Sequence, residues 1–223
     1  MKDRQPKYRQ LARERAKAER KERGRRERGS ALVVCEGECT EPYYLRGLLA
    51  HLGINDASVE VVAGKTDSNA VAVVHRARER FGQIPRDRVF VLVDAEQADL
   101  SRALRLCATP LQHANKRKEQ PEIRIEPIVS TPCFEVWLLQ HFRYSDQPFA
   151  CFDDVLRELR ADLPDYVKAD RRIFLKVGGG EGLRRALLNT AALRVAQVKT
   201  GSMAPATDID KLVEALYSIA PSE

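Results

Sequence analysis

The stretch Ala31–Tyr44, ALVVCEGECTEPYY, decides the fold of this chain. It opens with the apolar run Ala31–Cys35, which is too short for a globular helix and is typical of a strand buried on both faces of a sheet. Glu36 follows directly, so we expect a carboxylate at the carboxyl end of a core strand, and Gly37 lets the chain turn sharply behind it. Ligands of open parallel α/β sheets bind at this edge, which makes Glu36 the first candidate site residue.

A helix is predicted immediately after this turn. Thr40 is the expected N-cap, Glu41 favours the first helical turn, and Pro42 fits an N-terminal helical position. The helix is expected to run over 41–52, with Gly53 as its C-terminal stop. Strand, acid, glycine and helix therefore follow one another without a gap.

A second strand ends in acids in the same way. The apolar run Val89–Val93 is followed by Asp94 and Glu96, and a further helix is predicted from residue 98. Acids that meet at one sheet edge repel one another unless a cation neutralises them. Hard carboxylate oxygens suit Mg²⁺ or Mn²⁺, and Mg²⁺ shares its remaining coordination positions among water and phosphate oxygens. The two strand ends therefore predict a divalent-metal site.

The composition is that of a globular protein with one sizeable core. The chain has 223 residues, 43% of them hydrophobic, and no apolar run approaches the roughly 20 residues of a membrane span. The N-terminus is basic and polar instead of carrying an apolar signal region, which predicts a cytoplasmic protein without membrane contact. The five cysteines are odd in number and no paired CxxC spacing recurs, so we expect reduced, mostly buried thiols and neither disulfides nor a zinc site.

The basic charge of the protein is concentrated in its first 29 residues. They contain 13 Lys and Arg against 5 Asp and Glu, which leaves 25 and 27 for the rest, so the body is slightly acidic. We expect a charged helix here. It either contacts the phosphates of a nucleic acid or stays solvated or partner-bound, with opposite charges at helical spacing. Tyr8 is its one aromatic residue, so base stacking by the tail is not expected.

The remaining chain alternates strands and helices before it becomes helical. Strands are expected over 31–35, 58–62, 89–93 and 123–128, and helices over 41–52, about 68–81 and 98–116. The alternation of the last strand predicts an exposed or edge position, which Pro127 near its end supports. The pattern predicts an α/β fold with a parallel sheet flanked by helices over 30–130, preceded by the basic tail 1–29 and followed by a helical extension over 131–223. The extension is expected to contain a flexible glycine link at 178–180 and helices over 133–142, 153–161, 181–198 and 208–219.

Several motifs of the chain resemble the RloB family. The most specific are CEGExTEPxY over 35–44 and TPCFEVWLLQHF over 131–142, with the acids after a later strand between them. Weaker similarities are Tyr166-Val167-Lys168 and TDIDKLV over 207–213, so the resemblance covers nearly the whole chain. It implies a Toprim-like domain, as found in topoisomerases, primases and OLD-type nucleases.

The resemblance implies roles for three acids. Toprim domains use a Glu after the first strand and an Asp-x-Asp after a later one, so Glu36 corresponds to that glutamate and Asp94 to the first aspartate. RloB-like sequences usually read Asp-Arg-Asp-Glu-His at the second motif, whereas this chain reads DAEQA over 94–98. Glu96 keeps a carboxylate, but its longer side chain shifts the oxygens by about one methylene, and placement errors near 1 Å can cost ~100-fold in rate.

The activity implied by the resemblance is metal-dependent cleavage of phosphodiester bonds in DNA or RNA, tRNA included. Glu36, Asp94 and Glu96 are the expected metal ligands and catalytic acids. Glu41 either binds a second ion or only favours its helix N-terminus. Lys168 is expected to neutralise the scissile phosphate, unless it is simply solvated.

Four further residues are candidate contacts to phosphate or substrate. Lys65 and Asp67 lie in the loop after the second predicted strand, where Asp67 or Ser68 is also the expected cap of the next helix. Glu135 lies in an apolar helix, where its alternative role is a buried structural hydrogen bond. His141 lies in the same helix, but its spacing from Glu135 forms no HExxH zinc motif.

The resemblance also implies a cellular role in antiphage defence by abortive infection, beside an ABC- or AAA-type ATPase encoded nearby. No Walker A sequence occurs, so any ATP dependence must come from another chain. An oligomer is compatible with the sequence. Two other functions remain open: a catalytically weak or inactive module that binds nucleic acid or the ATPase, and a nucleotidyl-transfer or primase-like activity at the same metal site.

Overall fold

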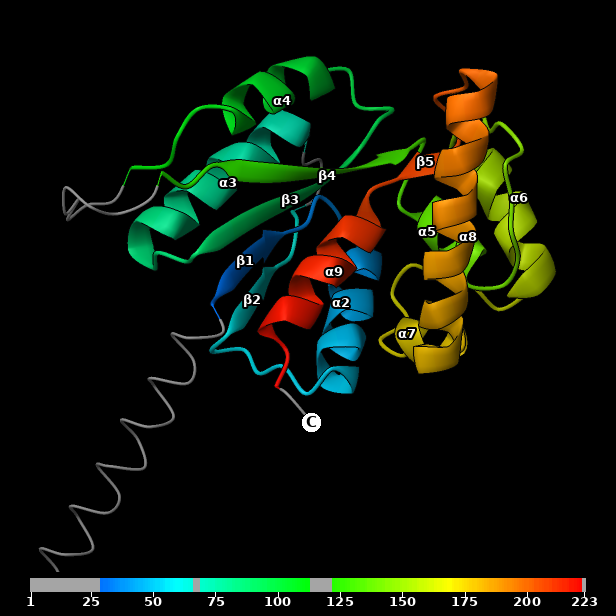
Figure 1. The fold of residues 1–223 in the computed structure, drawn as a ribbon, viewed down its shortest axis with the longest axis horizontal. Helices are drawn as coiled ribbons and strands as arrows, with labels where there is room; N and C mark the ends of the chain where they lie inside the picture. The colour runs from blue at the N-terminus through cyan, green and yellow to red at the C-terminus, as the bar shows by residue number, and fades with distance from the viewer. Residues whose placement is uncertain (1–28, 66–68, 113–121, 222–223) are drawn as a thin grey trace, which may run out of the picture.

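A five-stranded, mostly parallel sheet forms the centre of the molecule (Figure 1). The computed structural model describes residues 29–65, 69–112 and 122–221. The strand order is β2-β1-β3-β4-β5, and only β5 runs antiparallel to its neighbour. The strands are β1 (Ala31–Val34), β2 (Val59–Val62), β3 (Arg88–Asp94), β4 (Ile125–Thr131) and β5 (Ala206–Thr207). The predicted α/β class with helices flanking a parallel sheet is therefore confirmed.

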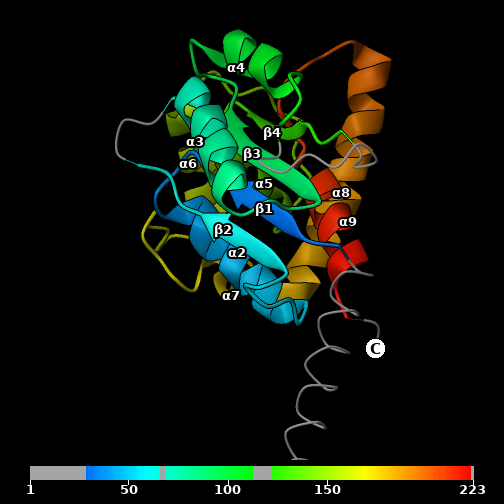
Figure 2. The ribbon, with the colours of Figure 1, turned by 90° about the vertical axis from the view of Figure 1, so that its left-hand side faces the viewer.

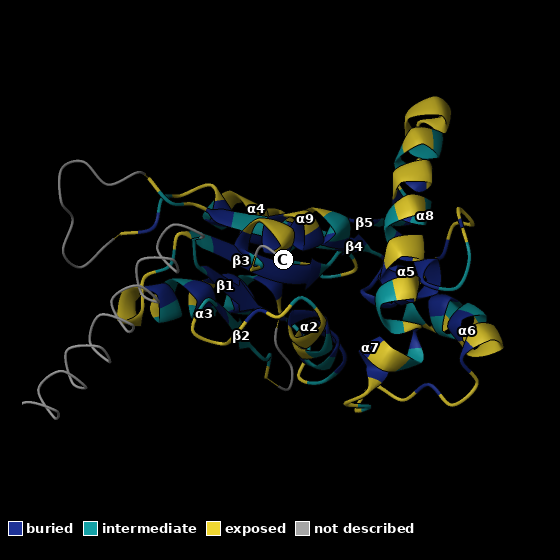
Figure 3. Ribbon diagram, turned by 60° about the horizontal axis from the view of Figure 1, so that its bottom comes forward, coloured by how far each residue is buried: buried dark blue, intermediate teal, exposed yellow. Residues whose placement is uncertain are grey.

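Helices cover both faces of this sheet, as Figures 1 and 2 show from two directions. One face carries α2 (Thr40–His51) and α9 (Ile209–Ile219), and the other carries α3 (Ala70–Gln83) and α4 (Leu100–Cys107). Strand residues alternate between the two faces, so that Val33 joins the core under α2 and α9 while Leu32 and Val34 join the core under α3 and α4. The central strands β1 and β3 are consequently buried between two helical layers (Figure 3), whereas β2 and β4 are partly exposed.

The chain reverses its direction of travel across the sheet between β1 and β3. After β1 it moves outward to β2, then crosses back through α3 to β3 on the other side of β1. Such a topological switch point opens a crevice at the carboxyl ends of the two central strands. Glu36 and Asp94 lie at these two strand ends.

The second half of the chain packs against the end of the sheet that carries β4 and β5, and over one of its faces (Figure 1). It contains α5 (Glu135–Gln140), α6 (Phe152–Asp162), α7 (Ile173–Lys176) and the long α8 (Gly179–Thr200). The chain then returns to the sheet, because β5 pairs with Ser130 and Thr131 and α9 packs on β4. The helical segment and the sheet thus share one hydrophobic core.

Several helix boundaries differ from the sequence predictions. The helix expected to reach residue 116 ends at Cys107, because Pro110 cannot continue a helix and disfavours helical backbone before it. The expected glycine link at 178–180 is largely helical, since α8 already begins at Gly179. The short helix α7 was not predicted.

The predicted helix caps differ from the observed ones, and the predicted edge position of Pro127 holds for part of β4. Asn69, not Asp67 or Ser68, caps α3 by accepting a hydrogen bond from the backbone N–H of Ala72 at 2.9 Å. Thr40 is already the first residue of α2, and its side chain bonds elsewhere. Pro127 lies where β4 pairs with β3 alone, as expected of an edge, while β5 covers only the last two residues of β4.

No helix among the described residues is long and apolar enough to cross a membrane. All five cysteines are free thiols, and Cys35, Cys107 and Cys133 are buried, in agreement with the prediction. The basic tail over 1–28 lies outside the described residues, so its predicted helix stays a prediction.

Candidate functional site

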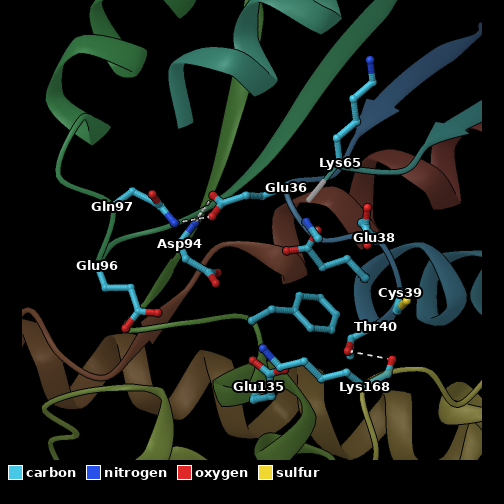
Figure 4. A pocket seen from close by; sticks show the side chains of 13 residues that line it. Glu36, Glu38, Cys39, Thr40, Lys65, Asp94, Glu96, Gln97, Glu135 and Lys168 are labelled. Carbon is cyan, nitrogen blue, oxygen red and sulfur yellow. Dashed lines mark hydrogen bonds between the residues drawn. The ribbon is translucent and has the colours of Figure 1, made fainter. Parts of the chain in front are cut away.

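A pocket of about 380 Å³ opens at the carboxyl ends of β1 and β3 (Figure 4). Acids from three separate stretches line it, together with two lysines and several uncharged residues. The acids are Glu36, Glu38, Glu41, Asp94, Glu96 and Glu135, and the lysines are Lys65 and Lys168. The topology therefore brings together residues that are more than one hundred positions apart in the sequence.

Glu36 is held at the end of β1 by two donors from the segment after β3. Its carboxylate accepts a hydrogen bond from the backbone N–H of Asp94 at 3.2 Å and a short one from the side-chain amide of Gln97. Burial raises the pKa of Glu36, the two hydrogen bonds oppose this rise, and the nearby charges of Asp99 and Glu96 add to it. Glu36 is thus locked to the β3 motif, as the predicted meeting of the two strand ends requires.

Asp94 is the last residue of β3 and points into the same space (Figure 4). The next residue, Ala95, still bonds through its N–H to the carbonyl of Ser130 in β4, which fixes the backbone at this position. Burial, followed by the negative charges of Glu41, Glu135, Glu36 and Glu96, raises the pKa of Asp94 to about 9. Glu96 is exposed at the pocket margin.

Glu41 folds back onto the turn that follows β1. It is 4% exposed, and its carboxylate accepts a hydrogen bond from the backbone N–H of Gly37 at 2.8 Å. Burial, with the charges of Glu36 and Glu135, raises its pKa to about 8. Glu41 therefore closes the turn that carries Glu36 and contributes to the pocket wall at the same time.

Glu135 begins α5 and is held by a tyrosine from a distant loop. It is 4% exposed, and Tyr166 donates its hydroxyl proton to the Glu135 carboxylate at 2.6 Å. The Thr40 hydroxyl lies 3.3 Å from the Tyr166 hydroxyl and donates to the carbonyl of Lys168 at 3.1 Å. These contacts join α2, α5 and the loop 163–172 on one side of the pocket.

The side chains of the two pocket lysines, Lys65 and Lys168, point in different directions. Lys65 lies in the wall at the end of β2, and its side chain points away from the carboxylates (Figure 4). Lys168 extends along the wall on the side of Glu135, with its ammonium 4.0 Å from the centroid of the Phe152 ring. Of the two, Lys168 is the one placed to meet an anion beside the acids.

One candidate contact, His141, is not brought to the pocket. His141 is fully buried between Tyr44, whose hydroxyl lies 3.0 Å from its Nε2, and the carbonyl of Val177, 3.2 Å from its Nδ1. Burial lowers its pKa to about 3, so it is a neutral part of the core. Asp67 lies outside the described residues.

Two residues that hold predicted acids in place were not themselves predicted as site residues. Gln97 orients Glu36. It stands where the second motif of the RloB pattern has Glu, and this difference was the feature of the sequence that could have pointed to it. Tyr166 holds Glu135, and its signal was the weak Tyr-x-Lys motif. Both act by hydrogen bonding across long sequence separations, which local patterns do not reveal.

The donor set suits a hard divalent cation, because it supplies carboxylate oxygens that repel one another when no cation is bound. Yet no three Asp, Glu, His or Cys side chains of the described ranges converge as a preformed ion cage. Glu36, Glu41 and Glu135 use oxygens to accept hydrogen bonds. An ion held here would use the carboxylate oxygens and lone pairs that these hydrogen bonds leave free, with water filling the positions that the protein does not supply.

The fold and pocket define the class of the protein: a doubly wound α/β domain with an acidic pocket at its topological switch point. The family follows from comparison. The model of the RloB family, described as RloB-like protein, matches residues 31–216, so the chain belongs to this family. Neither curated proteins nor solved structures give a match.

Proposed function

We propose that this protein is a Toprim-type, Mg²⁺- or Mn²⁺-dependent nuclease that cleaves phosphodiester bonds in DNA or RNA. One observation carries the proposal: Glu36 and Asp94, 58 positions apart, lie at adjacent strand ends in one pocket, where a hydrogen bond from Asp94 N–H to Glu36 links them. Glu96, Glu41 and Glu135 add carboxylates to the same walls. Family membership supports the same reading.

The residues of the pocket have different roles in the proposed reaction. Glu36, Asp94 and Glu96 would hold the cation, and Gln97 keeps Glu36 facing Asp94. The chemistry supplied by a cation held there would be polarisation of a phosphoryl oxygen and a lowered pKa of an attacking water. Lys168 binds the phosphate as a point charge opposite the acids.

The family also supports a proposal about cellular role. We infer that the nuclease acts in antiphage defence by abortive infection, together with an ABC- or AAA-type ATPase encoded nearby. ATP hydrolysis must come from that partner, because the glycine-rich run 177–182 has neither the spacing nor the lysine of a Walker A motif.

The test is a cleavage assay with matched variants. Labelled DNA and total tRNA are incubated with purified protein in EDTA, Mg²⁺ or Mn²⁺, beside Glu36→Gln, Asp94→Asn and the exposed control Asp56→Asn. We expect cleavage only with metal, a loss of at least about 100-fold in the first two variants, and no change in the control. Cleavage that survives both pocket variants would rule out this site as the reaction centre.

A second function is favoured by the departure at Glu96 and by the absence of a preformed ion cage among the described residues. In it, the protein is a catalytically inactive module that binds nucleic acid or the ATPase. The same assay separates the two, because the module predicts tight, metal-independent binding without cleavage in any of the three conditions.

A further inference from the structure

Lys168 lines the acidic pocket, but its charge is not paired with any of the pocket's carboxylates. Its neighbours in the wall include Glu41 and Glu135, yet Lys168 forms no ion pair within the part of the chain that the structure describes. Its ammonium instead lies over the face of Phe152, 4.0 Å from the ring centroid. An aromatic ring attracts a cation through its quadrupole and leaves the positive charge in place.

The backbone of Lys168 is held as well. Thr40, buried at the start of α2, donates its hydroxyl proton to the Lys168 carbonyl at 3.1 Å. Tyr166, two residues earlier, is anchored by its 2.6 Å hydrogen bond to Glu135. Both ends of this flexible side chain therefore have a defined position, which is uncommon for an exposed lysine.

Phe152 is itself fixed by packing. It is the first residue of α6 and is half-buried against a small apolar cluster. The cluster consists of Cys133, Val136, Leu139, Phe149 and Val155, and therefore includes residues of α5, the helix that Glu135 begins. One packing unit thus sets the positions of the aromatic ring and of an acid in the pocket wall.

We propose that Phe152 is a positioning residue for Lys168, holding its ammonium at the pocket wall in a charged, unpaired state ready for a substrate phosphate. The inference rests on the proposed function for the identity of that anion. Phe152 lies outside the acidic motifs, and its ring affects substrate binding only through its contact with Lys168. Without the ring, Lys168 is free to pair with the pocket acids or to move into solvent.

A double-mutant cycle tests this directly. The variants are Phe152→Leu, Lys168→Met and the pair together, with Phe152→Tyr as the conservative variant that keeps an aromatic face. Dissociation constants for short fluorescent DNA and RNA strands are measured by anisotropy in Ca²⁺ and in EDTA, and kcat and KM are measured in Mg²⁺. Thermal melting of each variant establishes that it is folded.

Phe152→Leu is expected to weaken binding roughly 3- to 10-fold in the presence of Lys168 and by less than about 2-fold in the Lys168→Met background. The loss should appear mainly in KM, and Phe152→Tyr should restore most of it. An equal loss in both backgrounds, or no loss at all, overturns the proposal, since the ring then acts only through packing or not at all. If the wild-type protein binds nucleic acid but never cleaves it, only the nuclease proposal fails. The dissociation constants of the four variants still decide the role of Phe152.

Discussion

At the scale of single residues, the pocket brings buried and partly buried carboxyl groups close to one another. Burial and mutual repulsion raise the pKa of Asp94 to about 9 and that of Glu41 to about 8. A carboxyl group in an unfolded chain titrates near 4. In the metal-free fold these acids therefore favour the protonated form. Ionising them at neutral pH lowers the stability of the fold, and a bound cation would remove this loss.

Replacing Asp94 by Asn should stabilise the metal-free protein, and increasingly so as the pH rises. The folded pKa lies above the unfolded one, so the favourable contribution of Asp94 is complete below about pH 4 and is lost as the pH rises toward 9. In EDTA at pH 8 we expect Asp94→Asn to gain roughly 1–3 kcal/mol, a rise of several degrees in melting temperature, and to gain little at pH 5.

Thermal melts across this pH range, with the exposed Asp56→Asn as control, provide the measurement. Added Mg²⁺ should reverse the order, because a ligand that binds only the folded wild-type site stabilises it by mass action. A pH-independent difference between wild type and variant would show that Asp94 is not under electrostatic strain.

At the scale of elements, the pocket depends on how closely two strand-end loops approach. The N–H of Gly64, after β2, donates to the carbonyl of Gly37, after β1, at 2.9 Å. A Cβ atom at position 64 would lie 1.7 Å from the Glu36 carbonyl oxygen, a backbone atom that cannot rotate away. Gly64 is therefore required for the contact that places Glu36 and Lys65 in one pocket.

Gly64→Ala should consequently separate these loops, with a loss of roughly 1–3 kcal/mol in stability and a large loss of activity. The matched control is Gly82→Ala, at a helical position of α3 where a Cβ meets no atom within 4 Å. That substitution should gain about 0.5–1 kcal/mol, because alanine favours helix. Denaturant unfolding measures both changes, and a Gly64→Ala protein as stable and active as wild type would contradict the account.

Local patterns predicted the four parallel strands, the fold class and the meeting of Glu36 with Asp94, but not β5. Buried parallel strands and the acids after them leave short, continuous signals, whereas a two-residue strand does not. They did not predict α7, the early end of the helix at Cys107 or the burial of His141. These features depend on tertiary packing, such as the ring contacts of Tyr44 with Phe134, Trp137, His141 and Phe174. Partners of this kind are too distant in sequence for periodicity to reveal.

At the scale of the whole molecule, the pocket is a joint product of both halves of the chain. The sheet supplies Glu36 and Asp94, while the segment after β4 supplies Glu135, Tyr166 and Lys168. The body outside the first 29 residues is slightly acidic, with 25 Lys and Arg against 27 Asp and Glu. If the proposed function holds, the basic N-terminal tail is the part of the chain whose charge would attract a nucleic-acid substrate.

Deleting residues 2–28 should flatten the salt dependence of nucleic-acid binding, because the affinity gained by counterion release scales with the number of phosphates neutralised. A tail of the same composition in scrambled order is the control, and it should keep the wild-type slope. Anisotropy titrations between about 50 and 200 mM salt provide the comparison. A slope unchanged by the deletion would remove the tail from substrate binding.

The most direct test of the central claim is a crystal structure of the protein soaked in Mn²⁺, with anomalous differences recorded to locate the ion. The account predicts a peak in the pocket within direct coordination distance, roughly 2.1 Å for a small hard cation, of Asp94 and at least one of Glu36 and Glu96. It predicts no such peak in Asp94→Asn. A fully soaked wild-type crystal without a peak between these acids, or with its ion bound only elsewhere, would contradict the claim that they jointly hold a cation.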